Sequence, residues 1–321
     1  MNTPSADPED IEDLVRSLSR GSRQWISRHA GYLDSPAGRA ELPLTPRVKA
    51  LLQLALLCRC WTKADPQDPA LAETAAVVAQ VYQSPDFPYR DALDPRYSRQ
   101  LQLMYGALAP ADVAVEARRA VLARLRSCGI PTARPESPYL HLETRFFADM
   151  AGLDHRLDSY QDLYSASVLA QADETPASEL DSCNITHTVL YLSEFGLCDP
   201  GLAEPERRRA ARVLERLTEH CVRGGDWDSI GKLLLAQHSL GLDPLRTESG
   251  VAGLRLLARA QTPDGAIPGK SAAQHATPAS TPSRFFRLSY QSTLVTAMAM
   301  VVLTASRPAL AEPTSILQEV R

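Results

Sequence analysis

The sequence has no excess of basic residues, since 34 Lys and Arg stand against 38 Asp and Glu, which gives a formal net charge of −4. Proteins that follow a phosphate backbone need clustered positive charge, so nucleic acid is not an expected partner. No apolar run reaches the roughly 18 residues that a membrane-spanning helix needs. The most apolar stretch, residues 293–305, predicts a buried helix, and no membrane association is expected.

Cysteine is scarce, with six in 321 residues, which is too few for the disulfide framework of a small secreted protein. The N-terminal segment is acidic and has no apolar run of the kind found in secretion signals. Both absences predict a reducing, cytoplasmic setting.

Strand patterns and several catalytic motifs are also missing. Alternating β-branched runs bounded by hairpin turns do not occur. There is no phosphate-binding loop, dinucleotide fingerprint, His-Glu-x-x-His or Gly-x-Ser-x-Gly motif, and no aspartate-rich motif of isoprenoid synthases or terpene cyclases. An all-α fold is therefore predicted.

The sequence does contain a recurring helix end. Apolar residues at helical spacing are followed by Gly, Leu and then Asp at Gly152, Gly196 and Gly241, which are 44 and 45 residues apart. A glycine in the left-handed conformation ends a helix, and the next Leu folds back onto the last turn. A further helix end is predicted near Gly106. A period of about 45 residues fits a pair of helices with their connections.

We therefore expect residues 1–321 to form one all-α domain of about six repeated helical hairpins. Closure of these hairpins into an α/α toroid would place one end of the inner helices around a central cavity. The alternative is an open helical array of the kind that binds other proteins. The long segment 263–283 is expected to be a lid or an unordered connection, and the oligomeric state is left open.

The repeat places polar residues at equivalent positions of apolar helices. Nine residues before the four predicted helix ends stand Tyr97, Glu143, His187 and Lys232. In a closed ring these side chains converge on the mouth of the cavity, where we expect a small-molecule site. Matching the last unit by its sequence pattern sets Gln291, after Tyr290, beside the position of His187.

The sharpest cluster comprises Asp181, Cys183 and His187. Cys183 and His187 are four residues apart and share a helix face. These three residue types suit zinc, and three ligands with one open position would activate water. A structural interpretation is equally open, with Asp181 as a helix N-cap, Cys183 as a small core residue and His187 as a buried, hydrogen-bonded histidine.

The expected roles follow from these positions. We expect His187 to act as a general base, with Asp181 or Asp228 orienting it or donating a proton. For the segment that holds Asp228 the alternative is a loop and helix cap. The residues expected to bind substrate are Glu143, Asp226, Lys232, Tyr290 and Gln291.

Short segments resemble known families. Gln261, Asp264 and Gly265 form a Gln-x-x-Asp-Gly turn similar to that of squalene-type terpene cyclases and protein prenyltransferase β subunits. Those families are α/α toroids in which the turn ties successive helices together. Asp181-Ser-Cys183 and His187-Thr188 resemble parts of the prenyltransferase zinc site, although there the parts lie on two distant helices.

A longer resemblance, to an uncharacterised helical family of antibiotic-producing bacteria, rests on residues 186–196, 225–235 and 289–295. In that family a His follows the last Tyr, where this chain has Gln291. The resemblance implies natural-product biosynthesis. We expect an enzyme that carries out a cyclase-like or lyase-like reaction on a small molecule, the reaction class resting on fold analogy. The alternatives are a non-catalytic carrier and a scaffold that presents acidic outer helices to another protein.

Overall fold

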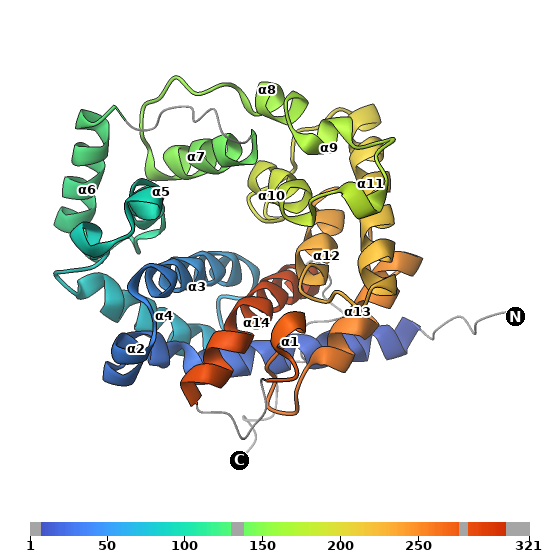
Figure 1. The fold of residues 1–321 in the computed structure, drawn as a ribbon, viewed down its shortest axis with the longest axis horizontal. Helices are drawn as coiled ribbons and strands as arrows, with labels where there is room; N and C mark the ends of the chain where they lie inside the picture. The colour runs from blue at the N-terminus through green and yellow to red at the C-terminus, as the bar shows by residue number, and fades with distance from the viewer. Residues whose placement is uncertain (1–7, 130–137, 276–281, 306–321) are drawn as a thin grey trace, which may run out of the picture.

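The computed structural model describes residues 8–129, 138–275 and 282–305, and these residues form helices and connections without a strand. The all-α prediction is confirmed for this part of the chain. Six helices contact one another in a cyclic order, each packing on the next and the last on the first (Figure 1). In that order they are α3 (Leu44–Ala64), α5 (Pro95–Leu108), α7 (Pro138–Ala151), α10 (Ser182–Leu192), α12 (Ile230–Ser239) and α14 (Pro282–Ala305).

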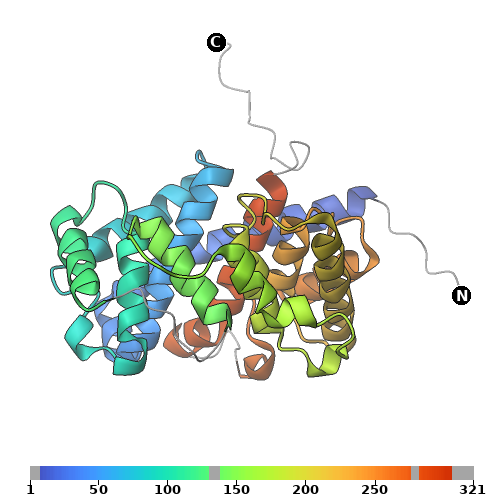
Figure 2. The same cartoon turned by 90° about the horizontal axis from the view of Figure 1, so that it is seen from above.

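The remaining helices lie outside this ring (Figure 1). They are α1 (Pro8–Ala30), α2 (Pro36–Glu41), α4 (Pro69–Gln83), α6 (Val115–Ser127), α8 (Tyr160–Ser165), α9 (Val168–Gln171), α11 (Glu204–Arg223) and α13 (Glu248–Ala260). Short 3₁₀ turns are η1 (Gly31–Asp34), η2 (Arg90–Ala92), η3 (Ala177–Glu179) and η4 (Lys270–Ala272). In Figure 2 the red α14 lies between the light-blue and cyan helices on one side and the yellow and orange helices on the other.

Glycines end three of the ring helices as predicted. Gly152, Gly196 and Gly241 have φ angles of 67°, 83° and 83°. After α7 the N–H of Leu153 bonds the carbonyl of Ala148 at 3.0 Å, which is the reversal expected when a glycine adopts the left-handed conformation. The fourth predicted helix end also exists, since α5 ends at Leu108, but Gly106 lies inside the helix and does not terminate it. A Cβ there would overlap Leu122, so this glycine lets α6 approach α5 closely.

The apolar segment 293–305 is a core helix, as predicted. It forms most of α14, which packs against α1, α3 and α12. By length and composition alone, Ser283–Ala305 is long and apolar enough to cross a membrane, but 67 % of its most apolar window is buried inside the molecule. Its apolar side chains are therefore accounted for by contacts with neighbouring helices.

The Gln-x-x-Asp-Gly turn joins the last outer helix to the first. The Gln261 side-chain Nε2 donates to the carbonyl of Leu18 at 3.3 Å and to that of Gly265 at 3.2 Å. Gly265 has a φ of 96°, and a Cβ on it would overlap the carbonyl oxygen of Gly21. Glycine at this position permits the backbone of the turn to touch α1.

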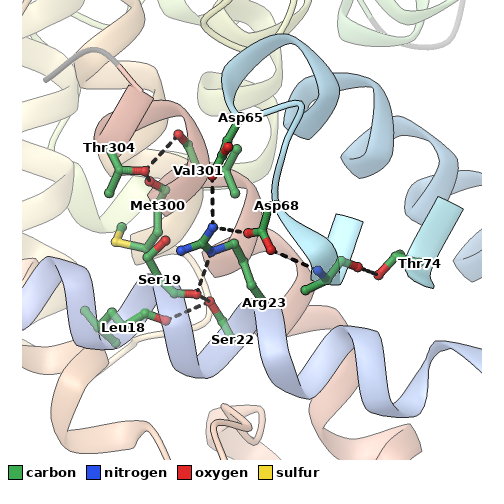
Figure 3. Close-up of polar contacts among 11 residues, drawn as sticks. Leu18, Ser19, Ser22, Arg23, Asp65, Asp68, Thr74, Met300, Val301 and Thr304 are labelled. Atoms are coloured by element: carbon green, nitrogen blue, oxygen red, sulfur yellow. Dashed lines mark hydrogen bonds and ion pairs between the residues drawn. The ribbon is translucent and has the colours of Figure 1, made fainter. Parts of the chain in front are cut away.

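Arg23 makes a second link from α1, shown in Figure 3. Its guanidinium binds the Asp68 carboxylate and lies 3.4 Å from Asp65, in the connection between α3 and α4. Asp68 also accepts from the N–H of Ala70 at 2.9 Å and so caps α4. One carboxylate thereby orients the start of α4 and holds α1 against it.

The turn after α10 reaches across the ring to α3. Glu194 lies 3.6 Å from both Arg59 and Lys63, near the C-terminal end of α3. Glu194 and Phe195 have φ angles of 47° and 60°, which are costly for residues with a Cβ. Phe195 packs on Phe146 of α7. This turn therefore occupies the end of the ring at which α3 and α10 finish.

Replacement of Gly265 by Ala tests the contact between the first and last outer helices. The left-handed backbone and the overlap with Gly21 each oppose a Cβ, so we expect Gly265→Ala to lower the free energy of unfolding by about 3 kcal/mol. Gly201→Ala is the matched control because Gly201 has a φ of 70° and no atom within 4 Å of its Cβ position. Urea unfolding measures both, and equal losses would contradict the proposed contact.

Candidate functional site

The N-terminal end of α10 is organised by Asp181. Its Oδ1 accepts from the backbone N–H groups of Cys183 at 2.8 Å and Asn184 at 3.3 Å. Asp181 is therefore the N-cap of α10, in agreement with the structural interpretation of the sequence. The Ser182 and Ser229 hydroxyls lie 3.0 Å apart and join the starts of α10 and α12. These two ring helices therefore begin side by side.

His187 lies one turn further along α10, and its contacts fix its tautomer. Nδ1 lies 2.8 Å from the Cys183 carbonyl oxygen and 3.2 Å from the Cys183 sulfur. A carbonyl oxygen can only accept, so Nδ1 carries the proton. Nε2 makes no hydrogen bond to any residue in the described ranges, and its lone pair is the free acceptor of the ring.

Burial and positive charge keep His187 neutral. Desolvation is the largest cause, Lys232 of α12 and Lys49 of α3 act in the same direction, and together they lower the pKa of His187 to about 4. The carboxylate of Asp181 and the hydrogen bond to Cys183 oppose this shift without cancelling it. At neutral pH the imidazole is therefore uncharged and lies near two lysines.

Aromatic side chains surround the imidazole. Tyr139 of α7 has its ring centroid 6.1 Å from that of His187, and Tyr191 of α10 is 5.7 Å away. Burial raises the pKa of Tyr191 well above its ordinary value, and the hydrogen bond with Glu143 adds to this. The pKa of Tyr139 is raised by burial and then by the charges of Glu143, Cys183 and Asp181. Glu143, Cys183, Asp181 and His187 thus lie in one neighbourhood.

The residues that meet here share a register. Lys49, Glu143 and His187 are each the sixth residue of α3, α7 and α10. Tyr97, in the predicted set, lies close enough to add to the pKa shift of Tyr139 but is itself 52 % exposed. Sequence reasoning missed Lys49, Tyr139 and Tyr191. The two tyrosines stand four residues from Glu143 and His187 on the same helix faces, a spacing that would have identified them.

Asp228 has a structural role in this arrangement. Its carboxylate accepts from the backbone N–H of Lys270 at 3.0 Å and from the Ser292 hydroxyl at 2.9 Å. The Trp227 indole N–H donates to the Pro268 carbonyl at 2.7 Å, and the Lys270 ammonium binds the Gly224 carbonyl at 2.7 Å. The described part of the predicted lid, residues 263–275, is thereby fastened to the start of α12 and to α14. Residues 276–281 lie outside the described ranges.

The other predicted substrate-binding residues are distributed more widely. Asp226 follows the end of α11, where its N–H bonds the Cys221 carbonyl at 2.8 Å. Tyr290 is half-buried and stacks on Phe286, with centroids 5.5 Å apart, while Gln291 is exposed. The contacts of these side chains therefore place them in local packing or at the surface.

The three predicted zinc ligands do not converge on one point. Asp181 binds backbone N–H groups, while Cys183 and His187 contact each other. Within the described residues no group of three or more His, Cys, Asp or Glu side chains could hold a metal ion. All six cysteines are free thiols.

Comparison with known proteins gives one match. A family model, described as a domain of unknown function (DUF6895), matches residues 19–301. No curated protein and no solved structure matches the chain.

The lowered pKa of His187 predicts how the free energy of unfolding depends on pH. Below its ordinary pKa of 6.5 the unfolded chain binds a proton on this residue, whereas the folded chain excludes the proton until about pH 4. The unfolded state then holds more protons, so the free energy of unfolding falls as the pH is lowered through this window. The effect reaches at most about 3 kcal/mol. Urea unfolding between pH 7 and pH 4 should show it.

His187→Asn removes the titrating group, so its unfolding free energy should decline less between these pH values. His220→Asn, at an exposed position of α11, is the control and should follow the unmodified protein. If all three proteins show the same slope, His187 is not held neutral by the fold.

Asp228→Ala tests the fastening of residues 263–275. Without the carboxylate, the N–H of Lys270 and the hydroxyl of Ser292 lose their acceptor, which is worth about 1–3 kcal/mol. We expect faster amide exchange across residues 263–275 by hydrogen–deuterium exchange mass spectrometry. Asp226→Ala, two residues earlier, should leave this exchange unchanged, and equal protection in both variants would refute the assigned role of Asp228.

Proposed function

The chain belongs to the DUF6895 family of domains of unknown function, and from the chemistry of its own residues we propose that it is an enzyme acting on a small organic molecule beside His187. The proposed reaction is cyclase-like or lyase-like, and His187 is the proton acceptor. The observation that carries the proposal is the fixed tautomer of a neutral imidazole, whose Nδ1–H is committed to Cys183 while Nε2 has no partner among the described residues.

The low basicity of His187 restricts the proton transfers that it can carry out. An imidazole with a pKa of about 4 is too weak a base to remove a proton from an ordinary neutral carbon acid. It is basic enough to deprotonate a carbocation, and the step that ends a cationic cyclisation or elimination is such a proton transfer. The faces of Tyr139 and Tyr191 next to the imidazole can stabilise a passing cation through their π electrons.

The two lysines supply a second element of recognition. Lys232 of α12 and Lys49 of α3 both act on the pKa of His187, so their ammonium groups lie near the imidazole. Their ammonium groups would hold an acidic group of the substrate, a role that agrees with the expected binding function of Lys232. Glu143, hydrogen-bonded to Tyr191, would orient that phenol toward the substrate.

The proposal includes a closed α/α toroid of repeated hairpins. The cyclic order of helix contacts and the turn that joins α13 to α1 support closure. Glu194 bridges the opposite end of the ring to α3, so the substrate would enter from the end at which α10 and α12 begin. One family model over residues 19–301 supports a single domain. We assign the protein to natural-product biosynthesis on the sequence resemblance, and to the cytoplasm on its few cysteines and its acidic N-terminal segment.

The test is untargeted mass spectrometry of a bacterial small-molecule extract incubated with the protein. Cyclisation leaves the elemental formula unchanged and shifts the retention time, whereas elimination removes a small molecule such as water. We expect the unmodified protein and His220→Gln to convert the same compound. His187→Gln should be slower by a factor of about 10²–10⁴, the usual contribution of a general base.

A carrier is the second candidate, because a weakly basic imidazole also suits a hydrogen-bond acceptor for a ligand hydroxyl. Retention of one compound through gel filtration without conversion, weakened in His187→Gln, would replace the enzyme by the carrier. If no compound is converted and none is retained, the small-molecule site beside His187 is refuted.

A further inference from the structure

The guanidinium of Arg47 is buried without a carboxylate partner. Arg47 is the fourth residue of α3, and 6 % of its surface is exposed. Its Nη1 donates one long hydrogen bond, 3.4 Å, to the carbonyl of Leu33 in η1, and its buried Nε–H has no acceptor. Nη2 makes no hydrogen bond to a described residue, and no ion pair in the described ranges includes Arg47.

Two aspartates close to the start of α3 are already paired with other arginines. Arg39 of α2 binds Asp34 with an Nη2–Oδ1 distance of 2.8 Å, and Arg96 binds Asp94 at 2.6 Å. The less buried Arg23 has two carboxylate partners (Figure 3). Arg47 is thus the more deeply buried arginine and the one whose charge these carboxylates do not neutralise.

A buried guanidinium without a carboxylate partner is energetically unfavourable. A guanidinium does not lose its proton in a protein, and an unpaired buried charge destabilises the fold. The Tyr89 ring, whose centroid is 5.2 Å from the guanidinium carbon, offsets a part of that cost. Tyr89 itself has a φ of 53°, a strained conformation for tyrosine. Such strain persists where the surroundings need the side chain in one place.

We propose that Arg47 binds the oxyanion of a small ligand, a carboxylate or a phosphoryl group, beside Tyr89 at the start of α3. The two unused donors, Nε–H and the Nη2 amino group, form one edge of the guanidinium, and this edge matches two oxygens of a carboxylate or phosphate. The start of α3 would also attract an anion. Its N-cap is Pro43, and no side chain caps its first N–H groups.

The Arg47 site is separate from the proposed active site. Lys49, which acts on the pKa of His187, is two residues further along α3. Two residues correspond to a rotation of about 200° around a helix. Arg47 therefore faces η1 and Tyr89 on the outer side of α3, whereas Lys49 faces the interior of the ring, so the oxyanion site can exist whether or not His187 is catalytic.

The test is the dependence of stability on anions. Urea unfolding of the full chain is measured with increasing sodium phosphate, sodium acetate and sodium chloride at matched ionic strength. A ligand that binds only the folded state raises the unfolding midpoint in proportion to the logarithm of its concentration. We expect phosphate or acetate to raise the midpoint above the chloride series. The stronger of the two identifies the phosphoryl or carboxylate class.

Three variants locate the effect. Arg47→Met keeps a long side chain without charge. It should retain only the general stabilising effect of these salts, so phosphate and acetate should raise its midpoint less than that of the unmodified protein. Without phosphate or acetate, its midpoint should be at least as high as that of the unmodified protein. Arg47→Lys retains the charge but loses the two-donor edge, and its affinity should fall at least tenfold. Arg39→Gln removes a neighbouring, already paired arginine and should leave the anion response unchanged.

A second measurement does not depend on any variant. The ¹⁵N resonance of the Arg47 Nε–H should shift on titration of the unmodified protein with the stabilising anion. The proposal is wrong if phosphate and acetate act like chloride, or if Arg47→Met retains the same anion response. A destabilised Arg47→Met together with no anion response in the unmodified protein would make Arg47 a purely structural residue.

Discussion

The burial of α14 is the constraint on which the rest of the structure depends. This helix is apolar over most of its length and packs against α1, α3 and α12, which come from both ends of the chain. Its apolar surface is removed from water only when the N-terminal and C-terminal helices meet, and the hydrophobic effect favours that meeting. The turn at Gln261 makes the same connection on the outer side. Because α3 packs on α14 and α14 on α12, Lys49 is brought near enough to His187 to affect its pKa.

The two ends of the ring differ chemically as a result. At one end the turn after α10 carries Glu194 to the cations of α3 and Phe195 onto α7, so side chains of that turn are committed to the protein itself. At the other end the Ser182 and Ser229 hydroxyls join the starts of α10 and α12. Among the described residues, neither Nε2 of His187 nor the Lys232 ammonium has a hydrogen-bond or ion-pair partner. The proposed function uses these groups to contact the substrate.

Local signals in the sequence predicted local features well. Gly152 and Gly241 marked helix ends because a left-handed residue is needed there. The interpretation of Asp181 as a helix N-cap was also correct. Long-range features had no such signal. Asp228 binds the backbone of Lys270 and the hydroxyl of Ser292, 42 and 64 residues away, and no pattern around Asp228 announces those partners. Lys49 was not predicted as a site residue. The other positions were counted back from a glycine at the helix end, and α3 ends without one.

His187 and Arg47 differ in how the fold accommodates the free-energy cost of burying a charge. Both are ionisable groups taken out of water, and a buried charge without a partner is unfavourable. The imidazole avoids the cost by remaining neutral, since its proton is lost at a pKa of about 4, and it keeps a free lone pair at Nε2. The guanidinium has no neutral form within reach. The fold gives it only the Leu33 carbonyl and the face of Tyr89, so neutralisation of its charge requires an anion from outside the described residues. In the two proposals, therefore, the imidazole accepts a proton and the guanidinium binds an oxyanion.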